Sequence, residues 1–321
     1  MIDSSTDDVP PSNEAIDRAI AASARQADMT EGRPYVVLDE AGRVVHRSAK
    51  SRSQLVDRRL EADEMITHQR LVAAAASFTN LMAAHPHVGE LIQLGGPPLT
   101  RMECFLFRTW IHRAEAIPDA ALSSLVVDLL RNRIPPVAGT DHRTWLAIDR
   151  DLLARFSVAA RGNDDDLVRL WTSVMIWGYV TDNRGPSKIG TALSVGKAEL
   201  VKRLRNSLNR IDTPNLLNAH RGCGRLGVSY LPQIGEPFFT KWFWAAGLGN
   251  PGLPEMPLTF DSRVRARLTK LGGPWIPVGR IAPEKRYVDY CELLTAVAGH
   301  LQPTFPGLNP EQIEYALYCM G

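Results

Sequence analysis

The stretch YLPQIGEPFFTKWFWAAGLGNPGLPEMPLTFDSRV, residues 230–264, decides how the chain is organised. Lys241 is the only charged residue in its most apolar part, 238–248. This part predicts a helix, on which Lys241 shares a face with Phe238 and Trp244 by three-residue spacing. The sequence therefore places one ammonium group among aromatic side chains.

Two interpretations of Lys241 follow from this pattern. In the first, the ammonium group reaches water along its own methylene groups, as lysines on apolar surfaces commonly do. In the second, the group stays partly desolvated, which disfavours its charged form and makes it an amine nucleophile. The apolar segment taken alone favours the first interpretation, so the residues around it have to decide.

A short motif precedes the lysine and an acid follows it. Leu231-Pro232-Gln233-Ile234-Gly235 comes before the helix, and Asp261 stands 20 residues after Lys241. These residues resemble the helix-hairpin-helix DNA glycosylases, whose hairpin reads L-P-x-[IV]-G and is followed by a lysine and then an aspartate. FFTKWFWAAG and LTFDSRV are similar to bacterial 8-oxoguanine DNA glycosylase-like proteins and, more loosely, to the archaeal enzymes. The resemblance covers about 175–321 and is absent before about residue 55.

One spacing departs from the family pattern. The family's lysine usually follows the hairpin glycine by two residues, whereas Lys241 follows Gly235 by six. The hairpin of this chain is therefore either longer than usual or of another form.

The resemblance implies roles for individual residues. Lys241 would attack the sugar and form a Schiff base, and Asp261 would stabilise positive charge on the sugar and help to transfer protons. Asp261 also suits the N-cap of the helix after it, which is compatible with that role. Backbone N–H groups around Gln233, Ile234 and Gly235 would bind a DNA phosphate, since glycine permits close approach.

Basic residues are concentrated just before this region. From Asp182 to Arg225, nine basic residues stand against three acids. They form either a solvated helix face around 197–210 or a strip that contacts DNA phosphates. The resemblance includes a similar Asn-Arg-Gly-Pro loop and favours DNA, with Arg184 and Lys188 as the first contacts. The nine are Arg184, Lys188, Lys197, Lys202, Arg203, Arg205, Arg210, Arg221 and Arg225.

Composition limits the other possibilities. The net charge is +2, but residues 1–33 carry seven acids against three arginines, so the remainder carries about +6.

The four cysteines have no paired spacing, which excludes a disulfide framework and a C-x-x-C zinc site. We expect no iron–sulfur cluster and no catalytic metal, because neither cysteines nor histidines show ligand spacing. No apolar run is long enough for a membrane span or a signal peptide.

Periodicity predicts a chain that is almost wholly α-helical. Tyr35–His46, with Gly42 in the turn, is expected to be a β-hairpin. Asn163–Asp166 reads as a helix cap and not as a metal site. The expected helices lie at 13–27, 56–84, 99–116, 119–132, from Trp145 onward, 167–179, 262–271, 284–300 and 310–319.

The predicted fold is an all-α helix-hairpin-helix glycosylase fold with a short N-terminal β-hairpin and a disordered acidic tail. We expect three parts: a flexible tail at 1–33, a β-hairpin with helices at 34–138, and the glycosylase region at 139–321. The protein is expected to be a cytoplasmic, DNA-associated monomer that binds double-stranded DNA and no membrane.

The function that the resemblance implies is removal of 8-oxoguanine from DNA, with lyase activity through Lys241. Three alternatives stay open: a catalytically silent helix-hairpin-helix DNA-binding protein, a helical protein-interaction module that uses residues 56–135, and a glycosylase for another modified base, for example in phage defence. Lys241 argues against silent binding, which has no use for an amine placed among aromatic side chains.

Overall fold

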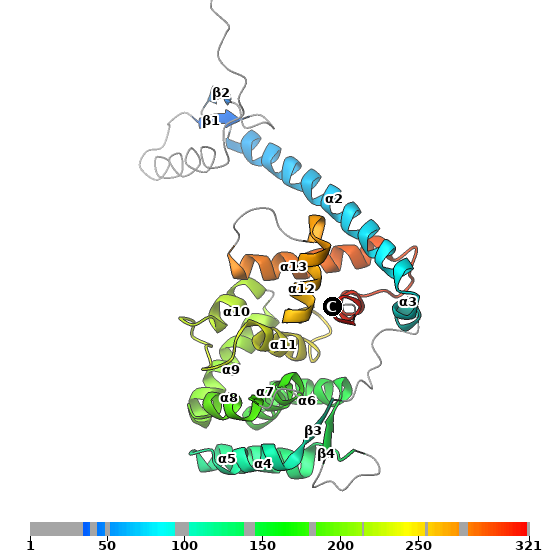
Figure 1. Ribbon diagram of the computed structural model, residues 1–321. Helices are drawn as coiled ribbons and strands as arrows, with labels where there is room; N and C mark the ends of the chain where they lie inside the picture. The colour runs from blue at the N-terminus through cyan, green and yellow to red at the C-terminus, as the bar shows by residue number, and fades with distance from the viewer. Residues whose placement is uncertain are drawn as a thin grey trace, which may run out of the picture. The chain divides into compact units, whose positions relative to one another are not determined.

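The computed structural model describes residues 35–38, 44–48, 52–93, 103–137, 145–179, 184–213, 215–253, 256–275 and 282–319. The expected acidic tail and the helix at 13–27 lie outside them. The chain divides into two compact units, Met1–Arg70 and Leu71–Gly321. Figure 1 shows the elements, and the mainly helical fold is confirmed.

The first unit contains the expected β-hairpin. Strands β1 (Tyr35–Leu38) and β2 (Val44–Ser48) pair in antiparallel fashion, with Tyr35 opposite Ser48. The turn with Gly42 lies outside the described residues. Helix α2 (Arg52–Ala84) begins in this unit and ends in the second.

The second unit opens with a region where two predicted helices are present but begin later than expected, each after a strand. The chain was expected to be helical over 99–116 and from Trp145 onward. Instead, β3 (Glu103–Leu106) and β4 (Trp145–Ile148) form an antiparallel pair. Short apolar runs do not distinguish a strand from a helix, and here pairing between distant segments decides the outcome. The helices of this region are α3 (Pro86–Gln93), α4 (Phe107–Glu115), α5 (Ala120–Asp128), the π-helical turn η1 (Leu129–Arg133) and α6 (Arg150–Gly162).

The rest of the second unit is helical in the described residues. Its last three α-helices match the expected ranges within one or two residues. The elements are α7 (Asp164–Tyr179), α8 (Gly185–Leu193), α9 (Lys197–Asp212), α10 (Leu216–Cys223), α11 (Glu236–Gly247), α12 (Ser262–Leu271), the 3₁₀ turn η2 (Gly273–Trp275), α13 (Pro283–Leu301) and α14 (Pro310–Cys319).

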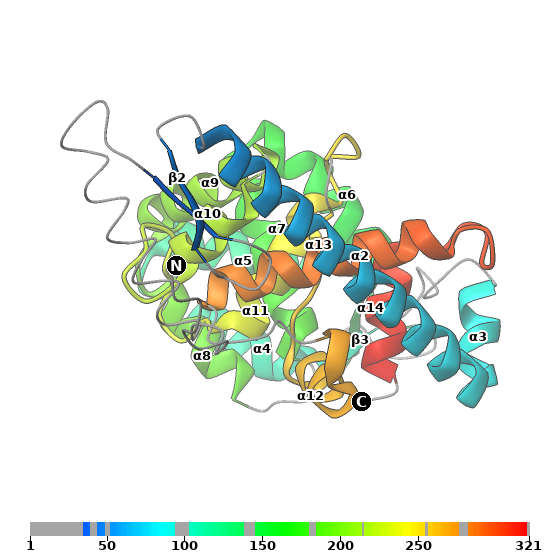
Figure 2. The ribbon, with the colours of Figure 1, turned by 90° about the horizontal axis from the view of Figure 1, so that it is seen from above.

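Helix α11 lies at the centre of this unit. It contacts α6, α7 and α9, and Figure 1 shows it between α7 below and α13 above, while Figure 2 shows the same helices from above. Trp242, Phe243 and Trp244 are buried, and the Trp242 indole N–H donates to the Ser207 hydroxyl of α9 at 3.0 Å. The Trp244 ring stacks on Trp177 of α7 with ring centroids 5.3 Å apart. The apolar helix around Lys241 is therefore part of the core.

The C-terminal end of α11 is fixed by α6. The Ser157 hydroxyl donates to the Ala246 carbonyl oxygen at 3.0 Å and accepts from the Gly249 amide at 2.9 Å. Arg161 donates to the same carbonyl at 2.9 Å. A Cβ on Gly249 would lie 2.6 Å from backbone atoms of Ser157, so glycine is required for this approach. These contacts satisfy backbone groups that a helix end leaves without partners.

The acid cluster at the start of α7 acts as a cap. The Asn163 side-chain oxygen accepts from the Asp166 amide at 2.9 Å, as an N-cap residue does. Within the described residues, no group of three or more His, Cys, Asp or Glu side chains is arranged to hold a metal ion. No described helix combines the length and the apolar composition that crossing a membrane requires.

We predict that Ser157→Ala destabilises the fold by about 1–3 kcal/mol, because the buried Ala246 carbonyl loses one donor and the Gly249 amide loses its acceptor. Urea denaturation measures this free energy of unfolding. Ser194→Ala, which removes a hydroxyl from an exposed helix end, is the matched control and should change it by less than about 0.5 kcal/mol. Equal stability of the two variants would mean that Ser157 does not fix α11.

Candidate active site

The connection between α10 and α11 is long. It runs over residues 224–235, and the Ser229 amide donates to the Gly222 carbonyl oxygen at 2.9 Å, which closes a first turn at the end of α10. The second turn lies at 231–234. The six-residue spacing does not come from this connection, because Gly235 is the N-cap of α11 and the residues from Gly235 to Lys241 run along the helix itself.

The second turn contains the L-P-x-I-G motif. The Ile234 amide donates to the Leu231 carbonyl oxygen at 3.2 Å, and both side chains are buried. Gln233 has φ of 65°, a region that residues other than glycine rarely adopt. Gln233 and Gly235 are exposed, and their amide groups donate to no other described residue. The turn is thus anchored by two apolar side chains and leaves backbone donors at the surface.

Lys241 and Asp261 lie together. The Lys241 Nζ is 3.2 Å from the Asp261 Oδ2, and the side chains are only 12% and 11% exposed. The other carboxylate oxygen, Oδ1, accepts from the amides of Arg263 at 2.9 Å and Val264 at 3.0 Å. One oxygen of Asp261 therefore caps α12, and the other faces Lys241.

A glycine of α7 makes room for the lysine. A Cβ on Gly178 would lie 3.1 Å from the Lys241 Cδ and 3.3 Å from the Phe238 ring, so any larger residue would push against both. The Lys241 Nζ lies 5.7 Å from the centroid of the Phe238 ring, within the range of a cation–π contact. Gly178 was not among the predicted site residues, although a glycine inside an apolar helical run is a known signal of close packing.

Aromatic rings connect Lys241 to the start of α8. The Tyr179 ring stacks on Phe238 with centroids 3.6 Å apart, and the Lys188 Nζ lies 5.5 Å from the Tyr179 centroid. Arg184, at the N-cap of α8, is exposed. The two stacked rings thus connect the two lysines: Lys188 contacts the Tyr179 ring and Lys241 contacts the Phe238 ring.

The segment before Asp261 is held against α11. The Thr240 hydroxyl donates to the Glu236 carbonyl oxygen at 2.8 Å and accepts from the Phe260 amide at 3.1 Å. On its other side, the Tyr290 hydroxyl donates to the Thr259 carbonyl oxygen at 3.0 Å. Hydrogen bonds from two helices therefore fix the position of Asp261 relative to Lys241.

A second carboxyl group lies behind Asp261. Glu314 of α14 is 3% exposed, accepts from the Thr259 hydroxyl and lies 3.9 Å from the Arg150 guanidinium. Burial raises the pKa of Glu314 to about 7. The negative charges of Asp261 and Glu311 also raise this pKa, while Arg150 and the Thr259 hydrogen bond lower it. Glu314 was also missed, because nothing in its local sequence marks a buried carboxyl group.

Another carboxylate lies at the start of α11, beside the hairpin. Glu236 accepts from His220 at 2.9 Å and from Arg265 at 3.0 Å, and Arg286 lies 3.4 Å away. Burial raises its pKa, but the His220 hydrogen bond and the three neighbouring basic groups outweigh burial and lower the pKa overall. Glu236 therefore joins α10, α12 and α13 at the hairpin.

Many of the basic residues between 182 and 225 are paired within the protein. Lys197 lies 2.7 Å from Asp165 and Arg205 2.9 Å from Asp164, which ties α9 to the start of α7. This favours the solvated-face interpretation for 197–210. Lys188 and Arg225 have no carboxylate partner among the described residues. The other ion pairs are Lys202–Glu199, Arg203–Glu199 and Arg221–Glu284.

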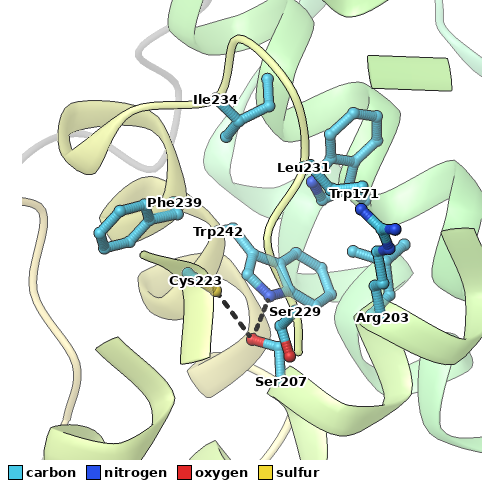
Figure 3. Close-up of a pocket in the computed structure, with 10 residues that line it drawn as sticks. Trp171, Arg203, Ser207, Cys223, Ser229, Leu231, Ile234, Phe239 and Trp242 are labelled. Atoms are coloured by element: carbon cyan, nitrogen blue, oxygen red, sulfur yellow. Dashed lines mark hydrogen bonds between the residues drawn. The ribbon is translucent and has the colours of Figure 1, made fainter. Parts of the chain in front are cut away.

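Figure 3 shows a small cavity behind the hairpin, and its lining includes neither Lys241 nor Asp261. The Ser207 hydroxyl in its wall lies 3.8 Å from the Cys223 sulfur. Burial raises the pKa of Cys223 to about 12, so its thiol stays protonated and unreactive. With room for about one water molecule, this cavity cannot hold a nucleobase.

Comparison with known proteins gives the family. Residues 111–318 match a family model described as "Putative 8-oxoguanine DNA glycosylase OGG-like protein". The chain belongs to this OGG-like family. The matched range includes Lys241, Asp261 and Glu314, and the OGG-like family is one of 8-oxoguanine-type DNA glycosylases, whose partner is DNA. Neither a search of curated proteins nor a search of solved structures found a match.

We predict that the stability of this OGG-like protein falls as pH rises from about 4.5 to above 7, because Glu314 binds a proton in the folded state that it loses in the unfolded state. The ordinary pKa of 4.5 and the folded pKa of about 7 set this window. Glu314→Gln should remove most of the loss, as measured by urea denaturation across the window.

Glu115→Gln is the matched control, since Glu115 is half exposed and forms a surface ion pair with Arg131. It should leave the pH dependence of the wild type in place. A Glu314→Gln variant with the wild-type pH dependence would contradict the prediction.

Proposed function

We propose that this protein removes 8-oxoguanine from double-stranded DNA and then cleaves the strand through a Schiff base on Lys241. The observation that carries the proposal is the Lys241–Asp261 pair, 3.2 Å apart and largely buried, in a chain of the OGG-like family. An amine that is partly removed from water and has a base beside it to take its proton is suited to nucleophilic catalysis.

The first step is displacement of the base. The Lys241 amine, after losing its proton, attacks C1′ of the sugar, so that the new C–N bond replaces the C1′–N9 bond. The base leaves with the electron pair and takes up a proton. The sugar ring then opens at C1′–O4′, O4′ is protonated, and an iminium ion remains between C1′ and the lysine nitrogen.

The second step is strand cleavage. A proton leaves C2′, and the C3′–O bond breaks so that the 3′ phosphate departs as the leaving group. The iminium group accepts the electrons from C2′, which is why a Schiff base promotes this elimination. Water then releases the lysine.

Asp261 is suited to help both steps. Its Oδ2 faces the lysine and is close enough to take the ammonium proton, while its Oδ1 stays bonded to the start of α12. The carboxylate therefore does not need to reorient when positive charge develops at the sugar, and preorganised charge is usually the largest single contribution to catalysis.

The Gln233–Gly235 turn is suited to hold the DNA. Its exposed backbone donors fit a phosphate, as other runs of free N–H groups do. A phosphate held there would fix the duplex beside α11 while the target nucleotide leaves the base stack. A catalytically silent protein could use the same turn, so the lysine chemistry has to be tested directly.

We predict that borohydride traps a covalent adduct between the protein and an 8-oxoguanine duplex, because it reduces the iminium ion to a stable amine. Lys241→Gln should lose the adduct and the strand cleavage but keep DNA affinity, since it removes the amine and retains most of the bulk. Asp261→Asn should keep the helix cap and binding and release base about 100-fold or more slowly.

Lys270→Gln, on the exposed part of α12, is the control and should trap like the wild type. Duplexes with uracil, an alkylated purine or an abasic site separate the alternative glycosylases, because the preferred substrate gives the strongest adduct. Base release by Lys241→Gln at the wild-type rate would make water the nucleophile and contradict the proposed role.

We also predict that Arg184→Ala with Lys188→Ala weakens duplex binding and flattens its dependence on salt by about one unit for each lost phosphate contact. Binding measured at several salt concentrations gives this slope. Lys202→Ala is the control, since its ammonium group is already 3.6 Å from Glu199. An unchanged slope in the double variant would reassign Arg184 and Lys188 to an ordinary solvated face.

A further inference from the structure

Arg150 is a buried arginine in the first turn of α6, and two acids of α14 share it. It is 5% exposed. Its guanidinium nitrogens lie 3.4 Å from Glu311 and 3.9 Å from Glu314, and its Nε has no hydrogen-bond partner among the described residues. Burying a charge is costly, and long or incomplete pairing returns little of that cost. Such a group is a poor source of stability, so the further contacts of its two acids matter more.

The first acid connects Arg150 to Asp261. One carboxylate oxygen of Glu314 lies near Arg150, and the other accepts from the Thr259 hydroxyl. Thr259 stands two residues before Asp261, and its carbonyl oxygen accepts from the Tyr290 hydroxyl at 3.0 Å. Thr259 is thus held by its side chain and by its backbone. A shift of Glu314 would therefore move the segment that carries the catalytic acid.

The second acid connects Arg150 to Lys241. Glu311 accepts from Arg150 at 3.4 Å and from the Trp244 indole N–H. The Arg150 guanidinium also lies 4.7 Å from the centroid of the Trp244 ring, within the range of a cation–π contact. Trp244 is buried and stands three residues after Lys241, so the two side chains are neighbours on α11. Arg150 therefore contacts the helix that carries the amine, both directly and through Glu311.

We propose that Arg150 is a positioning residue of the reaction, which sets the separation of Lys241 and Asp261 through Glu311 and Glu314. An arginine suits this task because its N–H donors form a rigid fork that can serve two carboxylates at once. The inference rests on the proposed function, because a pair that does no chemistry needs no fixed separation. Displacement of a reacting group by about 1 Å is enough to slow a reaction about 100-fold.

The test measures base release from an 8-oxoguanine duplex in a single turnover, over a range of protein concentrations in excess of DNA. Arg150→Met removes every donor and keeps most of the bulk. It should lower the rate constant at saturation about tenfold to 100-fold and leave the half-saturating concentration unchanged, because a buried residue does not contact the DNA. Loss of folded protein alone would do the opposite: it would raise the half-saturating concentration and leave the rate constant at saturation unchanged.

Thr259 tests the connection to Asp261 with a smaller change. Thr259→Val loses the hydroxyl and keeps the shape of the side chain, and it should lower the rate constant about tenfold. Thr259→Ser keeps the hydroxyl and should restore the wild-type rate constant. Arg150→Met should slow the Thr259→Val protein less than it slows the wild type, because the two changes break one connection. A wild-type rate constant in Thr259→Val overturns the connection even where Arg150→Met does not fold.

Arg169→Met is the matched control. The Arg169 side chain is 16% exposed and also bridges two acids, Asp128 at 3.2 Å and Asp166 at 2.8 Å, neither of which lies on α11, α12 or α14. It should keep the wild-type rate constant. A wild-type rate constant in Arg150→Met, or equal slowing in Arg169→Met, overturns the positioning role and leaves the proposed function standing. Absence of base release and of a borohydride adduct with the wild type overturns the proposed function, and the inference with it.

Discussion

The division of the Asp261 carboxylate between two partners is the constraint on which the site depends. One oxygen is bonded to the first amides of α12 and the other faces Lys241. The direction of α12 therefore sets the position of the acid, and the position of α11 sets the position of the amine. The Thr240 bridge ties α11 to the segment before α12, while the Ser157 contacts and the glycine at 178 hold α11 against α6 and α7.

Such a pair is costly to bury. Removing two charges from water takes several kcal/mol for each ion, and their attraction in the interior returns that only in good geometry. The Lys241–Asp261 pair keeps about a tenth of each side chain exposed and uses the partial charge at the start of α12 to hold the acid. A pair of well-packed apolar residues would serve stability at least as well. The ionic pair therefore fits the catalytic role that we propose for it.

The sequence predicted the local features of this fold. The helix around Lys241, the cap at Asp261 and the proline-initiated last helix follow from neighbouring residues alone. The features that it did not predict depend on distant contacts. Strand β3 is a strand because β4 lies beside it, and Glu314 differs from an ordinary surface acid only because α14 packs behind Asp261. The surplus of positive charge around α9 was visible in the sequence, but its ion pairs with the start of α7 were not.

Those ion pairs also affect how long the protein would stay on intact DNA. A cation that already holds a carboxylate releases few counterions when it approaches a phosphate, so it adds little to non-specific affinity. With Lys197 and Arg205 engaged in this way, these two side chains add little to the attraction of an undamaged duplex. Encounters with intact DNA should therefore be shorter than the positive charge of α9 alone would give.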